Sequence, residues 1–253
     1  MIYSDSRDIS SRLIKGAMKK AEFSVINNAD AVIICADSRR EQIAGSHPKR
    51  LEVIYNTPKN SKEISDCFDE IKNSSRCKIV YVGTLQKSRF LSEIIRFIEK
   101  DDRFELHIGG FGMMENEVAG AAEKCSRIRF YGRLPYDKTL ALENACDIMT
   151  AIYDPSVPNH KYAAPNKLYE ALMLGKPLVA ARCTGFDDII EKNNIGRLIE
   201  YTEAGLADGL NSLAAEKEHW HSIGEKMKKL YQEHYSGAEM EKRLAALYAE
   251  CDT

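Results

Sequence analysis

The stretch YDPSVPNHKYAAPNKLYEALMLGKPLVAA, residues 153–181, carries the clearest signal for the fold. A loop rich in Pro and Asn runs into Pro165, which suits the first turn of a helix, and the apolar-periodic segment that follows stops at Gly175, which suits a helix end. The run KPLVAA (176–181) then has the composition of a buried strand. Loop, helix and buried strand in this order are the repeating unit of an α/β fold.

Strand-like and helical segments alternate along the rest of the chain as well. Helical patterns such as SEIIRFIEK (92–100) lie between short β-branched runs. These runs stand at 31–36, 51–55, 78–83, 104–110, 128–132 and 147–153. The alternation predicts the α/β class, with a Rossmann-like parallel sheet that carries helices on both faces.

Composition divides the chain into four parts. The stretch between Asn56 and Lys78 has no strand run and is rich in Lys, Asn and Ser, so we expect a linker at 59–76. It separates a short α/β segment (1–58) from a larger α/β domain (77–202). The charged end of the chain (203–253) has a helical period and is expected to form two or three amphipathic helices.

The bulk composition argues against several classes of protein. With 36 basic and 38 acidic residues the formal net charge is -2, which is too even to draw the chain onto nucleic acid. Seven scattered cysteines without metal-ligand spacing are expected to be reduced and mostly buried in a cytosolic protein. No apolar run approaches the roughly 18 residues that span a bilayer, and the N-terminus lacks a signal-peptide layout. We therefore expect a soluble, cytoplasmic chain, with a peripheral position at the inner membrane face left open.

The loop and helix around Pro165 predict an anion site. A helix start offers free backbone N–H groups, here near Asn166, together with the positive end of the helix dipole. In α/β folds this point lies at the carboxyl edge of the sheet, where phosphorylated ligands bind. Lys167 adds a positive charge in the first turn, and Glu170 lies on nearly the same face. For this segment alone, a surface helix with a solvated Lys and Glu remains an equal alternative.

The run PNKLYEALMLGKPLVA (165–180) is similar to the donor-binding motif of retaining, family-4-like glycosyltransferases, which have the GT-B fold. The resemblance implies the C-terminal half of a GT-B fold, in which Glu170 holds the nucleotide ribose and the helix start faces the diphosphate. Many family members carry a second glutamate eight positions earlier, next to the transferred sugar. Tyr162 stands there in this chain, so the sugar-side candidates are chosen by location alone: Asn159, His160, Lys161 and Tyr162.

A second match to this family is IVYVGTLQKSRF (79–90), a buried strand that ends at Gly83 and is followed by a polar loop. In the family, an Arg directly after the Gly and a basic residue five positions further face the diphosphate. Thr84 replaces the first here, so phosphate neutralisation is assigned to Arg89 and Lys167. An Arg at a helix start is unfavourable unless an anion lies nearby, which supports this assignment.

Two further matches complete the family order over residues 78–200. Gly110 and Gly112 are read as lining the donor cleft, and Glu115 in place of a third glycine disfavours a dinucleotide fingerprint. In IRFYGRLP (128–135) the resemblance implies that the backbone from Tyr131 through Gly132 to Arg133 contacts the base. Residues 27–58 resemble the end of the family's N-terminal domain, and MIYSDSRD (1–8) resembles an internal strand of that domain.

The resemblance implies retaining transfer from a nucleotide-diphosphate sugar, with UDP favoured, to a glycan or lipid-linked acceptor in polysaccharide biosynthesis. The helix start and the two cations Arg89 and Lys167 would stabilise the leaving diphosphate electrostatically, without metal or cofactor. Because fewer than 60 residues precede the linker, we expect most of the acceptor domain to be missing, and a homo-oligomer or a partner to supply it. Two alternatives stay open: a catalytically silent donor-binding subunit, favoured by Thr84 and Tyr162, and a nucleotide-sugar epimerase, disfavoured because no acid/base carboxylate and histidine set is seen.

Overall fold

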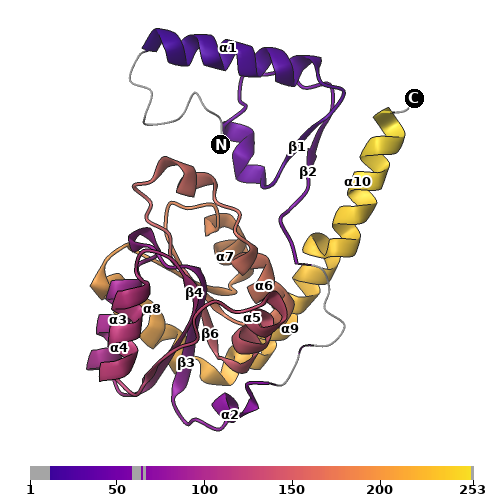
Figure 1. The fold of residues 1–253 in the computed structure, drawn as a ribbon. Coiled ribbons are helices and arrows are strands. Elements are labelled where there is room, and N and C mark those ends of the chain that lie inside the picture. The colour runs from indigo at the N-terminus through magenta and orange to yellow at the C-terminus, as the bar shows by residue number, and fades with distance from the viewer. Residues whose placement is uncertain (1–11, 59–63, 65–66, 252–253) are drawn as a thin grey trace.

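The computed structural model describes residues 12–58, 64 and 67–251, and its strands form two parallel sheets (Figure 1). One sheet has two strands in the order β1-β2, and the other has six in the order β5-β4-β3-β6-β7-β8. The strands are β1 (Val32–Ile34), β2 (Leu51–Val53), β3 (Cys77–Thr84), β4 (Phe104–Phe111), β5 (Ile128–Phe130), β6 (Ile148–Ala151), β7 (Leu178–Ala181) and β8 (Gly196–Ile199).

Helices alternate with the strands, as the sequence predicts. The α-helices are α1 (Arg12–Asn28), α2 (Asp69–Lys72), α3 (Leu91–Lys100), α4 (Glu115–Lys124), α5 (Tyr136–Ala145), α6 (Asn166–Leu174), α7 (Asp187–Asn193), α8 (Glu203–Ala215), α9 (Trp220–Leu230) and α10 (Gly237–Cys251). Short turns of other helix types are η2 (Asp37–Glu41), η3 (Lys87–Arg89), η4 (Pro158–Tyr162), η5 (Lys217–His219) and η6 (Tyr231–Tyr235).

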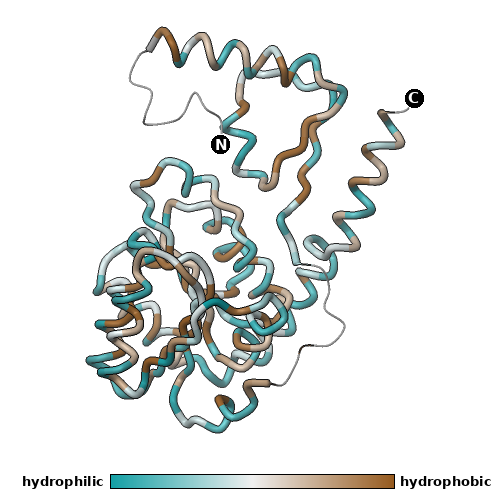
Figure 2. Tube along the Cα trace, viewed as in Figure 1, coloured by the Kyte–Doolittle hydropathy of each residue, from teal (hydrophilic) through white to brown (hydrophobic). Residues whose placement is uncertain are grey.

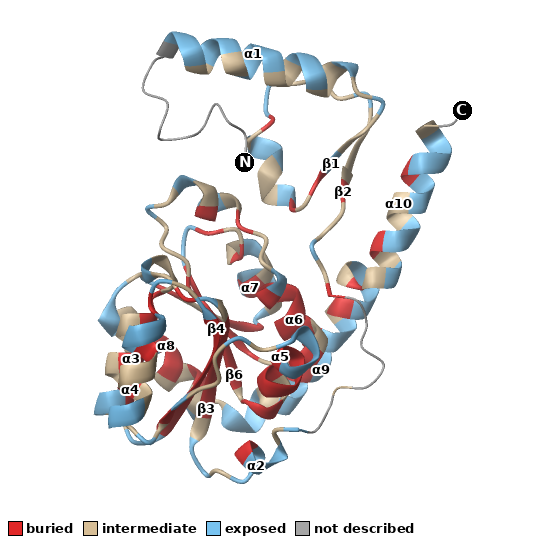
Figure 3. Ribbon diagram, viewed as in Figure 1, coloured by how far each residue is buried: buried red, intermediate tan, exposed pale blue. Residues whose placement is uncertain are grey.

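The six-stranded sheet is covered by helices on both faces, which confirms the predicted fold class (Figure 1). Alternate residues of β3 point to opposite faces, so Ile79 packs with α3, α4 and α8, whereas Val80 packs with α5, α6, α7 and α9. The strands and the inward helix sides are apolar (Figure 2) and buried (Figure 3), as a parallel sheet requires.

The winding of the chain changes direction in the middle of this sheet. From β3 the chain proceeds through β4 to β5 at one edge, and from β6 it proceeds through β7 to β8 at the other. Strands β3 and β6 are direct neighbours, with Ile79 opposite Ile148. Loops that leave such a pair diverge at their carboxyl ends and leave a crevice, which is where open α/β sheets bind ligands.

Two glycines allow the loops beside this crevice to approach closely. Gly110 has φ +138°, and a Cβ there would overlap the carbonyl oxygen of Gly83 at the end of the neighbouring strand. Gly112 has φ +147°, and a Cβ there would overlap the carbonyl oxygen of Leu85. The backbones of β3 and β4 can therefore lie against each other at the edge that carries the crevice.

The N-terminal segment contains α1 and the two-stranded sheet (Figure 1), and side chains of α10 reach the residues that flank β2. The backbone N–H of Tyr55 lies 3.1 Å from the sulfur of Met240 on α10, and Arg50 forms an ion pair with Glu250. The last helix therefore contacts the N-terminal segment. Large apolar side chains of this segment remain exposed, among them Leu13 at 87% and Val25 at 71%.

The structure also differs from the sequence interpretation in several places. It adds α1, α7 and the edge strand β8, which were not predicted, and the described part of 203–253 contains three α-helices. The expectation that the cysteines are mostly buried is wrong, because only Cys146 is buried, whereas Cys67 and Cys183 are exposed in loops.

The segment 1–8 lies outside the described residues. The boundaries of the linker at 59–76 stay a prediction, and α2 lies within that linker. Among the described residues, no helix has both the length and the apolar character needed to cross a membrane.

Candidate functional site

A pocket of about 430 Å³ opens at the carboxyl ends of β3 and β4, beside the start of α6. It occupies the crevice where the winding of the sheet changes direction. Its walls come from the ends of β3 and β4, from the loops that follow β3, β5 and β6, and from the first turns of α5 and α6. They are formed by Tyr81, Val82, Gly83, Thr84, Arg89, Gly110, Phe111, Arg133, Leu134, Tyr136, Thr139, Tyr153, Pro165, Asn166, Lys167 and Glu170.

The start of α6 is built as an anion site. Pro165 has an extended backbone and precedes the first helical residue, Asn166. The first N–H groups of a helix have no acceptor within the helix, so those near Asn166 are available to a ligand in the pocket. The other end of α6 closes at Gly175, which has φ +68° and donates its N–H to the carbonyl of Leu172.

Lys167 lies in the first turn of α6 and is buried. The alternative drawn from the sequence, a surface helix with a solvated lysine, does not fit this burial. Its Nζ lies 3.4 Å from Oε1 of Glu143 on α5 and 5.1 Å from the centre of the Tyr81 ring. Burial opposes its charge, but the carboxylates of Glu143 and Glu170 outweigh burial and raise the pKa of Lys167. The pocket therefore contains a lysine that keeps its proton.

Arg89 closes η3 at the entrance to α3, and two groups fix its guanidinium. The ring centre of Tyr153 lies 3.8 Å from its central carbon, and His160 Nε2 lies 3.2 Å from Nη1. The Nδ1 atom of His160 is 2.7 Å from the carbonyl oxygen of Asp154, which can only accept, so Nδ1 carries the hydrogen and Nε2 accepts from Arg89. Burial, together with Arg89, lowers the pKa of His160, in agreement with a neutral ring.

Glu170 occupies the second turn of α6 and lines the same pocket, with a relative exposure of 4%. Its neighbours Leu168 and Leu172 point into the core and hold the helix face in place. Burial, followed by the negative charge of Glu170, raises the pKa of Tyr136 across the pocket. A carboxylate in this position can accept hydrogen bonds from two adjacent hydroxyl groups.

The pocket brings together most of the residues that the sequence singled out as donor-binding. Both cations, Arg89 and Lys167, line it, as do Gly83, Thr84, Gly110, Arg133, Pro165, Asn166 and Glu170. Gly112, Tyr131 and Gly132 are not among its lining residues. The hydroxyl of Tyr131 lies 2.8 Å from Nδ1 of the buried His107, beneath the sheet edge.

Sequence reasoning missed several side chains of the pocket and of its floor. Phe111, Tyr136 and Tyr153 line it, and Arg133 lies with its guanidinium carbon 4.7 Å from the centre of the Phe111 ring. Glu143 lies behind Lys167. A buried charged residue in the apolar helix KTLALENA (138–145) is a signal that could have identified Glu143.

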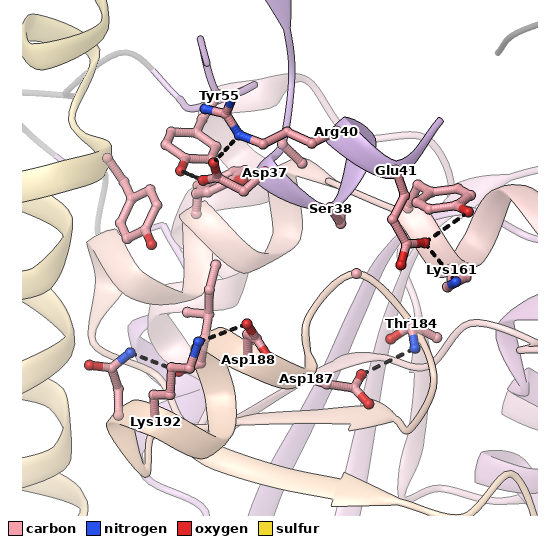
Figure 4. Close-up of a pocket in the computed structure, with 17 residues that line it drawn as sticks. Asp37, Ser38, Arg40, Glu41, Tyr55, Lys161, Thr184, Asp187, Asp188 and Lys192 are labelled. Atoms are coloured by element: carbon pink, nitrogen blue, oxygen red, sulfur yellow. Dashed lines mark hydrogen bonds and ion pairs between the residues drawn. The ribbon is translucent and has the colours of Figure 1, made fainter. Parts of the chain in front are cut away.

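The sugar-side candidates do not line this pocket; they belong to η4, which joins it to a second pocket. His160 contacts Arg89, and the buried Oδ1 of Asn159 has no hydrogen-bond partner in the part of the chain that the structure describes. Oε2 of Glu41 in η2 accepts from Lys161 Nζ at 2.7 Å and from the Tyr162 hydroxyl at 3.1 Å (Figure 4).

The second pocket has a volume of about 580 Å³ and lies between the N-terminal segment and the large sheet (Figure 4). Its upper wall carries Asp37, which accepts a hydrogen bond from the Tyr55 hydroxyl at 2.5 Å. Its lower wall carries Asp187 and the Asp188–Lys192 ion pair of α7. Sequence reasoning could not find it, because its walls come from segments more than a hundred residues apart.

Within the described part of the chain, no group of three His, Cys, Asp or Glu side chains could hold a metal.

A family model described as glycosyl transferases group 1 matches residues 76–216, more than half of the chain. The chain belongs to this family. The match begins next to β3 and ends after α8, so it contains every residue that lines the first pocket, at the carboxyl ends of β3 and β4. A search of curated protein sequences finds no match.

Solved structures of glycosyltransferases share the fold of this group 1 member. Sucrose-phosphate synthase from Thermosynechococcus elongatus aligns over 96% of this chain and 64% of its own, with 14% identity and a TM-score of 0.72. Anabaena HepE in complex with UDP-glucose aligns over 92% and 68%, with 16% identity and a TM-score of 0.71. S. aureus TarM in complex with UDP aligns over 92% and 46%, with 18% identity and a TM-score of 0.67. The chain thus has a GT-B type fold and spans less than two thirds of sucrose-phosphate synthase.

Proposed function

We propose that this chain binds a UDP-sugar in the pocket at the switch point of the large sheet and serves its retaining transfer to a glycan or lipid-linked acceptor. One observation carries the proposal: the pocket gathers two cations, Arg89 and Lys167, with a helix start and the carboxylate of Glu170. Cations and free N–H groups suit a diphosphate, and a carboxylate suits the ribose hydroxyls. Membership of the group 1 family and the UDP complexes of HepE and TarM support the same assignment.

The chemistry at this pocket is electrostatic. In retaining transfer the bond between the sugar's anomeric carbon and the diphosphate breaks, while the acceptor hydroxyl forms a new bond on the same face and gives its proton to an oxygen of the departing diphosphate. The departing diphosphate gains negative charge, and fixed positive groups stabilise that charge more than they stabilise the intact donor. Arg89 is fixed by Tyr153 and His160, and Lys167 is held from below by Glu143, so neither needs to reorganise.

A catalytically silent donor-binding subunit remains the second candidate. Thr84 lines the pocket where the resembling enzymes carry an arginine, so one phosphate-binding cation is missing. Position 162 is a tyrosine, so it supplies no carboxylate to a donor sugar. Its hydroxyl donates to Glu41 in the second pocket. A silent subunit would bind the nucleotide as tightly as an enzyme does, and it would release no nucleotide from a donor.

Calorimetry with UDP, GDP and ADP, followed by a turnover assay, tests the assignment. We expect UDP to bind best and to raise the unfolding temperature by mass action. Failure of all three nucleotides to bind would remove the proposed function. Release of UDP from UDP-sugars with a mixed acceptor extract identifies a transferase, and binding without release identifies the silent subunit. A change at C2 of the sugar without loss of nucleotide would instead indicate an epimerase.

A further inference from the structure

Glu143 is a charged residue in an otherwise apolar part of α5, directly behind the donor-side pocket. Its side chain has a relative exposure of 1%, and its flanking residues Leu142 and Ala145 belong to the core. Oε1 lies 3.4 Å from Lys167 Nζ, whereas the buried Oε2 has no hydrogen-bond partner among the described residues. Glu143 does not line the pocket, so a ligand there meets Lys167 and not Glu143.

This arrangement is unfavourable for stability alone. Burial of a carboxyl group with an unpartnered oxygen costs free energy, and a leucine at this position would incur no such penalty. The carboxyl group does, however, stabilise Lys167. A buried ammonium needs a hydrogen-bond acceptor on the side away from the ligand, and Glu143 supplies one. Glu143 thus accepts from the Lys167 ammonium on the side away from the pocket. The side of the ammonium that faces the pocket is left for an anion.

We propose that Glu143 is a positioning residue for the donor diphosphate: it holds the Lys167 ammonium from below, and its own charge sets the net charge that the phosphates meet. This inference rests on the proposed donor site. It assigns no contact between Glu143 and the substrate, and it acts through Lys167 alone.

The direction of titration supports this role. Burial raises the pKa of Glu143, Lys167 opposes that rise, and the Glu170 carboxylate adds to it. The other groups that face the pair are the phenols of Tyr136, on the same helix as Glu143, of Tyr81, on β3, and of Tyr153, after β6. When Glu143 is protonated, the pair carries one positive charge, and when it ionises this charge is cancelled. Diphosphate binding should therefore weaken as the pH rises through the titration of Glu143.

The test measures UDP affinity by calorimetry from about pH 6 to about pH 9 for the wild type and for Glu143→Gln, which keeps the shape and an acceptor oxygen but cannot ionise. The glutamine variant should match the wild type within about threefold at the low end, and it should exceed it by about tenfold at the high end. Because UDP itself titrates equally in both experiments, the difference belongs to Glu143. Identical pH profiles for the two proteins would overturn the inference.

Glu143→Met removes the acceptor and should weaken UDP binding by about tenfold at low pH. If Glu143 acts through the lysine, the same change should have no further effect in a Lys167→Met background, as a double-mutant cycle shows. Equal losses in both backgrounds would reveal a merely structural role. Fluorescence of the single tryptophan, Trp220, shows whether each variant is folded.

A readout without ligand separates this inference from the donor assignment. The ¹⁵Nζ resonance of Lys167, identified by its absence in Lys167→Met, should shift with pH in the wild type and stay constant in Glu143→Gln. If no nucleotide binds but the resonance behaves as expected, the donor site fails while the pairing stands. If UDP binds and the resonance does not respond to Glu143, the donor site stands and the positioning role is overturned.

Discussion

The two parallel sheets of this chain begin from similar sequence patterns and reach different degrees of burial. Strand β4 is buried along seven of its eight residues, because helices cover both faces of the six-stranded sheet. In the two-stranded sheet, Ile33 remains 48% exposed, and α1 beside it exposes Leu13 and Val25. A β-branched run therefore predicts a strand, but its burial depends on how many layers the rest of the fold supplies.

The difference between the sheets also explains where the site lies. A switch in winding direction needs strands on both sides of a central pair, which the large sheet has and the small one lacks. The donor-side pocket is accordingly built from loops of the large sheet alone. The small sheet contributes η2 and Tyr55 to the second pocket, whose opposite wall belongs to the large sheet.

Loss of both cations should have the largest effect on the donor-side pocket. In the double variant Arg89→Gln, Lys167→Met we expect UDP affinity to fall at least about a hundredfold, because each charge-assisted hydrogen bond contributes about 1.5–3 kcal/mol. Charge reversal at both positions should likewise remove detectable binding. The neutral pair is the cleaner test, because a glutamate at 167 would lie against Glu143 and Glu170. Calorimetry with UDP measures the loss, and unchanged affinity would contradict the site.

A pair of core truncations tests the unequal burial of the two sheets. Leu106→Ala in β4 removes a fully buried side chain and should lower the free energy of unfolding by about 2–5 kcal/mol. The matched change Val53→Ala in β2 should shift the same transition much less. Trp220 packs against the core of the large sheet, so urea unfolding followed by its fluorescence reports on that sheet. Equal shifts for the two variants would show that both sheets unfold as one cooperative unit.

Glu170→Gln should weaken UDP binding by about 1–3 kcal/mol, the usual range for loss of charge-assisted hydrogen bonds. The fold should persist, because Leu168 and Leu172 keep the helix in place. Inorganic pyrophosphate, which has no ribose, is the matched control ligand, and its affinity should stay nearly unchanged. An equal loss for UDP and pyrophosphate would rule out the ribose role.

Much of the large sheet could be predicted because its signals are local. Five of its six strands alternate with helices at the expected places, and β8 was missed. Its short sequence GRLI contains a glycine and an arginine, and its position at the sheet edge reduces the need for an apolar run. The start of α6 was predictable for the same reason, since Pro165 and Gly175 mark the helix ends in the sequence itself.

The partners of the site residues could not be predicted, because they depend on packing between distant segments. The pairing of Lys167 with Glu143 joins two helices, and the contact of Arg89 with His160 joins loops 71 residues apart. Likewise, the sequence offered Tyr162 as a sugar-side candidate by its location alone, and it could not show that the hydroxyl bonds to Glu41, 121 residues away. Residue type and spacing indicate which groups can serve a site, and only the fold shows what holds them.

Substitution of the exposed apolar residues of α1 should have the smallest effect on stability. It should nevertheless change the association of the chain clearly. Exposed apolar patches favour self-association or a partner, so we expect the wild-type chain to associate and, alone, to transfer sugar poorly. Leu13→Lys with Val25→Lys should change the free energy of unfolding by only about 0.5 kcal/mol and shift the chain toward a monomer. Met113→Lys, at a residue 79% exposed beside α4, is the matched control and should leave association unchanged. Light scattering and UDP release with a mixed acceptor extract measure the two properties together. A monodisperse wild-type monomer with robust turnover would show that the N-terminal segment, despite its exposed surface, suffices for an acceptor site.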